Sequence, residues 1–274
     1  GFTSQVEMYV HTRIAADALG ATRMDRPEWV DVHPTTGEVY ITMTNNSSRR
    51  VVPTGTQTKV DPANPRAYSD IRAAQTTQSG NVNGHIVRFK SDAPEATAFT
   101  WDVYLFGAEA AADPTLINLS GLTNDQDFSS PDGLVFTKSS GLCWIQTDDG
   151  AFTDQTNCMM MAAIPGQVGD GAKKSLAYKR GDGSEKRVDT HAGKAQTEAT
   201  LRRFLVGPKG AEITGWCESP DGKAMFVNIQ HPGENTKMAD VRDPAKYESQ
   251  WPANAGYGAG KRPRSATVVI TKLD

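Results

Sequence analysis

The sequence predicts an all-β fold, a β-propeller built from several four-stranded blades, with one peripheral helix at the N-terminus. Short β-type runs separated by Gly, Pro, Asn and Asp dominate the chain. Helical periodicity is confined to residues 4–19. A turn, strand, turn, strand pattern also recurs, in RPEWVDVHPTTGEVYITMT, SPDGLVFTKSSGLCWIQTD and TGWCESPDGKAMFVNIQ. Repeated hairpins of this kind are typical of propeller blades.

The helix is expected over residues 4–19. Its apolar residues recur at three- and four-residue steps and form one stripe: Val6, Tyr9, Val10, Ile14, Ala18 and Leu19. Ser4 suits the N-cap, and Gly20 suits the left-handed residue that ends a helix.

Strands are expected in the runs that combine β-branched, aromatic and other apolar residues. They are 38–44, 85–90, 99–106, 134–137, 142–147, 158–164, 201–206, 224–230 and 266–271. The polar segments 51–83, 165–200 and 231–264 contain Gly and Pro and are expected to be loops, with 169–187 the most solvated part.

Three glycines mark the tips of the repeated hairpins. Gly37, Gly141 and Gly222 each supply the positive φ that a tight hairpin needs. The hairpins over 84–106 and 158–206 would complete the four-stranded sheets. An irregular β-sandwich whose hairpins are alike by chance is the alternative.

The whole chain, 1–274, is interpreted as one propeller domain. About three blades fit in this length, whereas propellers have about four to eight and so leave no open edge. We therefore expect part of a six-bladed ring, incomplete at its N-terminal side.

Composition excludes two classes of partner. The chain has 29 Lys and Arg against 32 Asp and Glu, a formal charge of −3, so a surface for nucleic acid is not expected. No apolar run reaches the roughly 18 residues of a membrane-spanning helix. Cys143, Cys158 and Cys217 lie far apart without metal or redox spacing, and each is expected to be a small buried hydrophobe.

Acidic residues at the openings of the repeated units are the candidate metal ligands. In a propeller the first strand of each blade lines the axis, which places Glu28, Asp132 and Glu212 near one spot. Carboxylates this close repel unless a cation lies among them, and hard oxygen ligands suit Ca²⁺. Each acid taken singly is equally well a turn cap or a surface charge.

Other polar side chains flank these positions. Asn157 opens the 158–164 strand and offers a carbonyl oxygen, and Lys209 precedes Glu212 and offers a cation. His231 is followed by Pro and Gly and is expected to face a loop. Arg66 is either a cation for an anionic substrate or the anchor of its long loop. GxSxG, HExxH, P-loop and GxGxxG motifs are absent from the sequence, so metal-assisted chemistry is favoured.

Several motifs resemble the PhoX family of alkaline phosphatases. They are DRPEW with TNN, DPANPRA, NGHIVRF, SPDGLVF with LCWIQTD, RRFLVGPKGAEITG, SPDGKAMFVNIQHPGE and the late RPRSATVVIT. They occur in order through nearly the whole chain, and they resemble the C-terminal portion of a longer PhoX sequence.

The resemblance implies a secreted bacterial phosphomonoesterase, periplasmic or extracellular, that holds Ca²⁺ together with a pair of Fe³⁺ ions. Glu28 and Glu212 match metal-ligand glutamates of the family. Asn157 falls near a family asparagine, although the surrounding motif differs here. The family's iron-binding cysteine belongs to an N-terminal part that this chain does not contain, so iron depends on that missing half as a partner.

The substrate expected from the resemblance is a phosphate monoester, with Lys209 offsetting its charge. No protein nucleophile is nominated. A calcium-dependent propeller hydrolase of the lactonase type is a second interpretation. A non-catalytic propeller module, for binding or structure, is a third.

Overall fold

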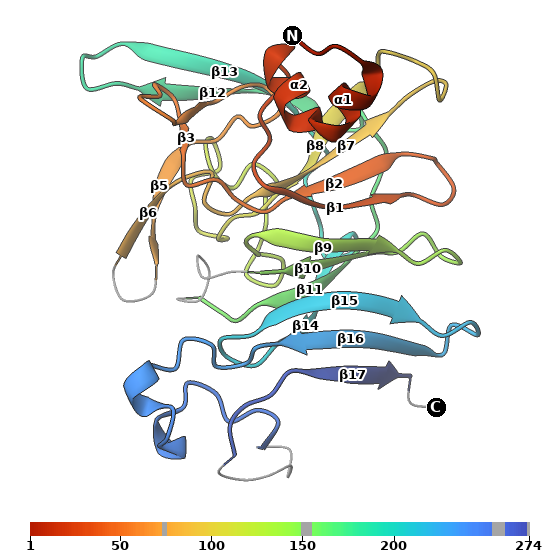
Figure 1. The fold of residues 1–274 in the computed structure, drawn as a ribbon, viewed down its shortest axis with the longest axis vertical. Coiled ribbons are helices and arrows are strands. Elements are labelled where there is room, and N and C mark those ends of the chain that lie inside the picture. Colours follow the sequence, from red (N-terminus) through yellow and green to blue (C-terminus); the bar gives the residue numbers. More distant parts are fainter. Residues whose placement is uncertain (73–75, 149–154, 254–260, 273–274) are drawn as a thin grey trace.

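Three β-sheets lie one above another along the long axis of the molecule (Figure 1). This computed structural model describes residues 1–72, 76–148, 155–253 and 261–272. The fold is mostly β, as the sequence predicts, with two short α-helices and two 3₁₀ turns among these residues.

The first sheet has six strands, one of which joins it through a parallel pairing. Their order is β1 (Pro27–Val32), β2 (Val39–Met43), β7 (His85–Lys90), β8 (Thr100–Phe106), β13 (Glu185–Ala192) and β12 (Ala172–Lys179). The second sheet is the four-stranded antiparallel unit that the hairpin pattern predicts. Its strands are β9 (Pro131–Phe136), β10 (Cys143–Thr147), β11 (Met159–Ala163) and β14 (Leu201–Val206).

The third sheet is an antiparallel meander of three strands, β15 (Glu212–Glu218), β16 (Ala224–Gln230) and β17 (Ala266–Thr271). Two small ribbons complete the β-structure. They pair β3 (Arg49–Arg50) with β4 (Thr58–Lys59), and β5 (Tyr68–Arg72) with β6 (Thr76–Gly80). The 3₁₀ turns span Met238–Asp240 and Pro244–Lys246.

The hairpin glycines behave as predicted. Gly37, Gly141 and Gly222 have φ of 69°, 70° and 68°, a region that costs an L-residue with a Cβ atom conformational energy. Each lies in the turn that joins the first two strands of its sheet, β1–β2, β9–β10 and β15–β16.

The prediction of a loop over 165–200 is wrong. This segment contains the long hairpin β12–β13, which extends the first sheet. Its alternate residues Leu176, Tyr178 and Val188 are buried in the core of that sheet, so a period-two pattern was present beneath the high charge. The loop expected over 51–83 likewise contains β4 and the β5–β6 ribbon.

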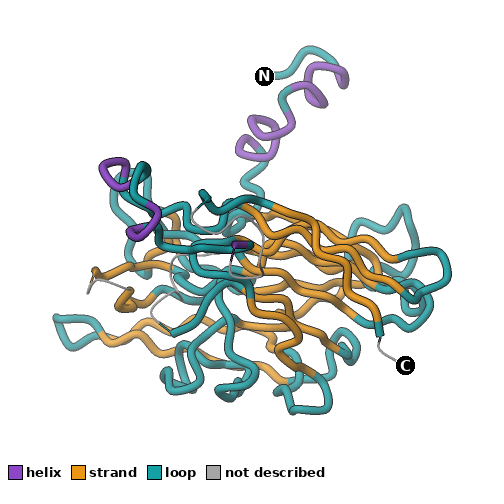
Figure 2. Tube along the Cα trace, turned by 90° about the horizontal axis from the view of Figure 1, so that it is seen from below, coloured by secondary structure: helices purple, strands orange, loops and turns teal. Residues whose placement is uncertain are grey.

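The single helix expected over 4–19 is two helices, α1 (Gln5–Val10) and α2 (Thr12–Ala18), because His11 has a non-helical backbone between them. Ser4 caps α1 as predicted. Both helices stand away from the sheets (Figure 2). Val6, Tyr9, Val10, Ile14 and Leu19 are exposed, and Ala15 alone is buried within α1 and α2.

Three strands of the second sheet, β9, β10 and β11, are buried on both faces, which explains their largely apolar sequences. Met159 and Met161 point into a core shared with Tyr40 and Ile86 of the first sheet. Met160 points the opposite way, into a core shared with the third sheet. The alternation along β11 therefore joins all three sheets.

Two buried polar side chains also join neighbouring sheets. The Thr42 hydroxyl, on β2, donates to the Asp132 carbonyl at 2.7 Å and accepts the Trp29 N–H at 2.9 Å. The Gln146 amide, on β10, donates to the Gly215 carbonyl of the third sheet at 2.9 Å. These hydrogen bonds fix the position of the second sheet relative to the first and to the third.

Buried arginines hold the long connections of the first sheet. Arg49 pairs with Asp25 at 2.7 Å, and Arg88 is held by Asp102 and Asp170, each at 2.7 Å. Arg66 is fully buried and donates to the carbonyls of Gly107 and Ile117. Of its two possible roles, the structure therefore supports the loop anchor.

Two cysteines follow the sequence prediction, and one does not. Cys143 and Cys158 are buried in the inter-sheet cores, whereas Cys217 is exposed. No disulfide joins these three cysteines.

We predict that Thr42→Val lowers the free energy of unfolding by about 1 to 2 kcal/mol, since the isosteric side chain loses both hydrogen bonds. Urea denaturation measures this loss. Thr271→Val, at an exposed position of β17, is the matched control and should shift stability by less than about 0.5 kcal/mol. Equal effects of the two substitutions would contradict a role for Thr42 between the sheets.

Candidate metal centre

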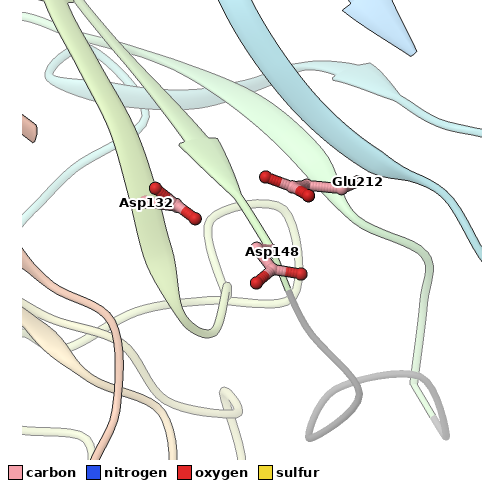
Figure 3. Close-up of side chains that lie close together, drawn as sticks. All are labelled: Asp132, Asp148 and Glu212. Atoms are coloured by element: carbon pink, nitrogen blue, oxygen red, sulfur yellow. The ribbon is translucent and has the colours of Figure 1, made fainter. Parts of the chain in front are cut away.

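Three carboxylates point toward one another at the edge of the second and third sheets where β9 and β15 begin (Figure 3). Asp132 is the second residue of β9, Asp148 follows the end of β10, and Glu212 is the first residue of β15. One oxygen of each lies within 4.8 Å of those of the other two. Each is partly buried.

The hairpin register explains why two of these acids meet. β9 and β10 are antiparallel, and Thr147 lies opposite Pro131, so the start of β9 and the end of β10 share one edge of the sheet. The Asp148 N–H donates to the Ser130 carbonyl at 3.1 Å, which fixes the chain just beyond the strand. Glu212 is held beside them by the Gln146 bond to the third sheet.

Burial and repulsion from neighbouring carboxylates disfavour the charged forms of Asp132 and Glu212. The pKa of Asp132 rises to about 6, chiefly because the carboxyl is desolvated and then because Glu28 and Asp148 are nearby. The pKa of Glu212 rises to about 7 through desolvation, followed by repulsion from Asp148 and Asp132. A bound cation would remove this penalty.

Glu28 belongs to the same electrostatic cluster, since its charge raises the pKa of Asp132. Arg26 lies near both of these carboxylates. Its guanidinium is 3.6 Å from the Glu28 carboxylate, and its charge opposes the rise in the Asp132 pKa.

His231 and Gln230 bind the outer oxygen of Glu212. The His231 Nε2 lies 3.4 Å from Glu212 Oε2, and the Gln230 amide donates to the same oxygen at 2.8 Å. His231 faces loop residues as expected, with its Nδ1 3.4 Å from the Gly210 carbonyl and 3.3 Å from the Glu234 carboxylate, but its contact with Glu212 was not predicted. Its backbone has φ of 37°, a left-handed conformation that turns the ring back toward the cluster.

Of the five residues that the sequence nominated, the structure places Asp132 and Glu212 in the cluster and Glu28 near Asp132. Asn157 donates its amide to the Gly207 carbonyl at 3.0 Å and so ties the start of β11 to the end of β14. Lys209 is exposed in the β14–β15 connection and forms no ion pair within the described ranges. The roles of Asn157 and Lys209 stay predictions.

Sequence reasoning missed Asp148, Arg26 and the contact of His231. A signal for Asp148 was present, because TDD directly follows a strand whose hairpin partner begins at SPDG. Antiparallel pairing alone places those two ends together. Arg26 precedes Glu28 by two residues, but only its left-handed backbone, with φ of 55°, sets its position.

The donor set fits a hard cation. Carboxylate oxygens are the ligands that Ca²⁺ prefers, and a divalent ion would reverse the raised pKa values of Asp132 and Glu212. Among the described residues no thiol adjoins the cluster, because Cys143 and Cys158 lie in the cores and Cys217 lies near the far end of β15. The described cluster is therefore an all-oxygen site.

No helix within the described ranges has the length and apolarity needed to cross a membrane.

We predict that, in the metal-free protein, the free energy of unfolding of Glu212→Gln increases relative to that of the parent as pH rises. The raised pKa means that folded Glu212 keeps its proton between about pH 4.5 and 7, whereas the unfolded chain loses it. Folding stability from this group is therefore lost as pH rises through that window. Urea denaturation with chelator at pH 5 and pH 8 gives the difference.

The exposed substitution Glu198→Gln provides the control for that comparison and should show no pH-dependent gain. A stability difference between Glu212→Gln and the parent that is the same at both pH values would contradict the raised pKa.

Comparison with known proteins gives two matches. The family model described as alkaline phosphatase PhoX matches residues 1–233. A solved structure, Pseudomonas fluorescens PhoX in complex with vanadate, a transition state analogue, is 33% identical, with a TM-score of 0.68. The match covers 99% of this chain and 38% of that one, so this chain spans well under half the length of that PhoX. No curated protein matches.

The family match covers most of the chain, and the structural match extends over the remainder. The chain belongs to the PhoX family of alkaline phosphatases.

Proposed function

We propose that this chain supplies the metal-binding carboxylates of an enzyme that hydrolyses phosphate monoesters. The observation that carries the proposal is the convergence of Asp132, Asp148 and Glu212 from two sheets, with oxygens within 4.8 Å. The relative of known structure binds vanadate, described as a transition state analogue, which supports phosphoryl chemistry for the family.

Four carboxylates would hold the cations. Asp132, Asp148 and Glu212 form the centre, and Glu28 extends it toward the first sheet. Ca²⁺ suits this oxygen set, and Fe³⁺, implied by the family, would need further ligands from outside this chain. Bound cations would supply electrostatic stabilisation of the charge that develops on the phosphoryl oxygens.

Arg26 is the cation that the protein itself presents. Its side chain is half exposed, so it is accessible to a dianionic substrate, and Arg binds phosphate oxygens in a bidentate manner. We propose that Arg26 orients the phosphoryl group over the carboxylates. Lys209 is a second cation for the same substrate, and Asn157 an additional oxygen ligand.

Exposed apolar residues on the first and third sheets support a propeller ring. Further PhoX sequence would complete that ring as a partner of this chain. Val30 and Val32 are exposed on the face of β1 turned away from β9. Phe226 and Val269 are paired across β16 and β17 and are exposed on the third sheet. In a closed ring, neighbouring blades would cover both faces.

We further infer a periplasmic or extracellular location, since membership of this family supports secretion. Fractionation of the producing cells tests the inference, and activity confined to the cytoplasm would contradict it.

We predict that the enzyme formed by this chain together with the further PhoX sequence hydrolyses p-nitrophenyl phosphate at alkaline pH when supplied with Ca²⁺ and Fe³⁺. Arg26→Ala should raise KM because an oxygen-binding cation is lost. Release of p-nitrophenolate is followed by absorbance. Turnover of a lactone but not of the phosphate ester would contradict the proposal and favour a lactonase-type hydrolase.

We predict that Ca²⁺ binding depends on the clustered acids. Asp148→Asn and Glu212→Gln should each lower Ca²⁺ affinity about tenfold or more, since each removes one charged ligand. Titration calorimetry at pH 8 measures the affinity. Glu198→Gln removes a negative charge outside the cluster and is the control. If it lowered Ca²⁺ affinity as much as Asp148→Asn does, the assigned site would be contradicted.

A further inference from the structure

We infer that Asn45 is a positioning residue that fixes the Arg26 guanidinium beside the acidic cluster, ready for a phosphoryl oxygen. The inference rests on the proposed function. It concerns how the substrate-facing cation is held, and it depends on hydrogen bonds that join the first sheet to the second.

Asn45 is the link between Arg26 and the neighbouring sheet. Its Oδ1 accepts a hydrogen bond from Arg26 Nη1 at 3.2 Å, and its Nδ2 donates to Ser130 Oγ at 3.2 Å. An amide is the side chain that can accept from a guanidinium and donate to a hydroxyl in this way, because a carboxylate has no proton to donate.

Ser130 is a rigid anchor for this link. It is fully buried with φ of 50°, and its N–H donates to the Asn83 carbonyl at 2.9 Å. Its own carbonyl accepts the Asp148 N–H, and it precedes Asp132 by two residues. The same backbone segment therefore fixes two carboxylates and, through Asn45, the cation that faces them.

The Arg26 backbone is fixed as well. Its carbonyl accepts the Thr44 N–H at 3.1 Å, and its φ of 55° directs the side chain along the rim of the cluster. The Arg26 backbone is thus held by Thr44 and its guanidinium by the adjacent residue, Asn45.

Without Asn45, the Arg26 guanidinium would keep only its contact with the Glu28 carboxylate, at 3.6 Å. Ordering a long, half-exposed side chain costs rotamer entropy. A guanidinium already held in place spares the substrate this cost on binding.

The experiment is a double-mutant cycle on binding of inorganic phosphate to the Ca²⁺-loaded protein, measured by calorimetry. The variants are Asn45→Ala, Arg26→Ala and the double substitution. Arg23→Ala removes an exposed positive charge three residues from Arg26 and controls for long-range attraction. Ca²⁺ affinity is measured for every variant.

Arg26→Ala is expected to weaken phosphate binding by about 10- to 100-fold and Asn45→Ala by about 3- to 10-fold. In the Arg26→Ala background the Asn45 substitution should have no further effect, because its role passes through Arg26. Ca²⁺ affinity should stay at the parent value in Asn45→Ala. If Asn45 had a purely structural role, Asn45→Ala would lower Ca²⁺ affinity, and it would weaken phosphate binding even in the Arg26→Ala background.

Ser130→Ala removes the other end of the link and gives a second test that does not alter Asn45. It too should weaken phosphate binding only when Arg26 is present. Additive losses in either cycle, or an Asn45→Ala protein with parental phosphate affinity, would overturn the inference while leaving the proposed function standing. Failure of the Ca²⁺-loaded parent to bind phosphate at all would overturn the proposed function, and the inference with it.

Discussion

Burial of β9, β10 and β11 of the second sheet on both faces is the constraint on which the rest of the structure depends. Because β11 sends alternate methionines into two cores, the first and third sheets are fixed relative to one another through the sheet between them. Apolar contacts alone would allow neighbouring sheets to slide past one another. The hydrogen bonds of Thr42 and Gln146 are directional and fix the position of each sheet relative to the next. The carboxylates converge because the sheets that carry them cannot shift.

The cluster is costly to the folded protein, and the cost is both electrostatic and conformational. Within the described ranges, the residues other than glycine with positive φ are Arg26, Ser130 and His231. All three lie at the rim of the acidic cluster or pin its backbone. Strained conformations and repelling charges persist only where surrounding structure holds them. Their coincidence at one place agrees with a site selected for binding.

The sequence predicted the class of fold and the hairpin turns well, because Gly37, Gly141 and Gly222 have a requirement that depends on local geometry alone. It misjudged the β12–β13 hairpin, where exposed lysines and arginines hide the alternating buried residues of two strands. In the candidate site, the proximity of Asp132 and Glu212 was predicted from their places at the starts of repeated units. Arg26 and His231 were not, since their positions depend on backbone conformations that no spacing encodes.

The raised pKa of Glu212 also has a consequence for thermodynamic measurements. Near neutral pH a divalent ion entering the cluster must displace a proton from this carboxyl. The heat observed on loading therefore includes the ionisation of whatever buffer takes up that proton, and it differs between buffers of unlike ionisation enthalpy. Occupancy at subsaturating ion concentration rises as the surroundings become more alkaline, which couples the loaded state of the protein to the acidity of its medium.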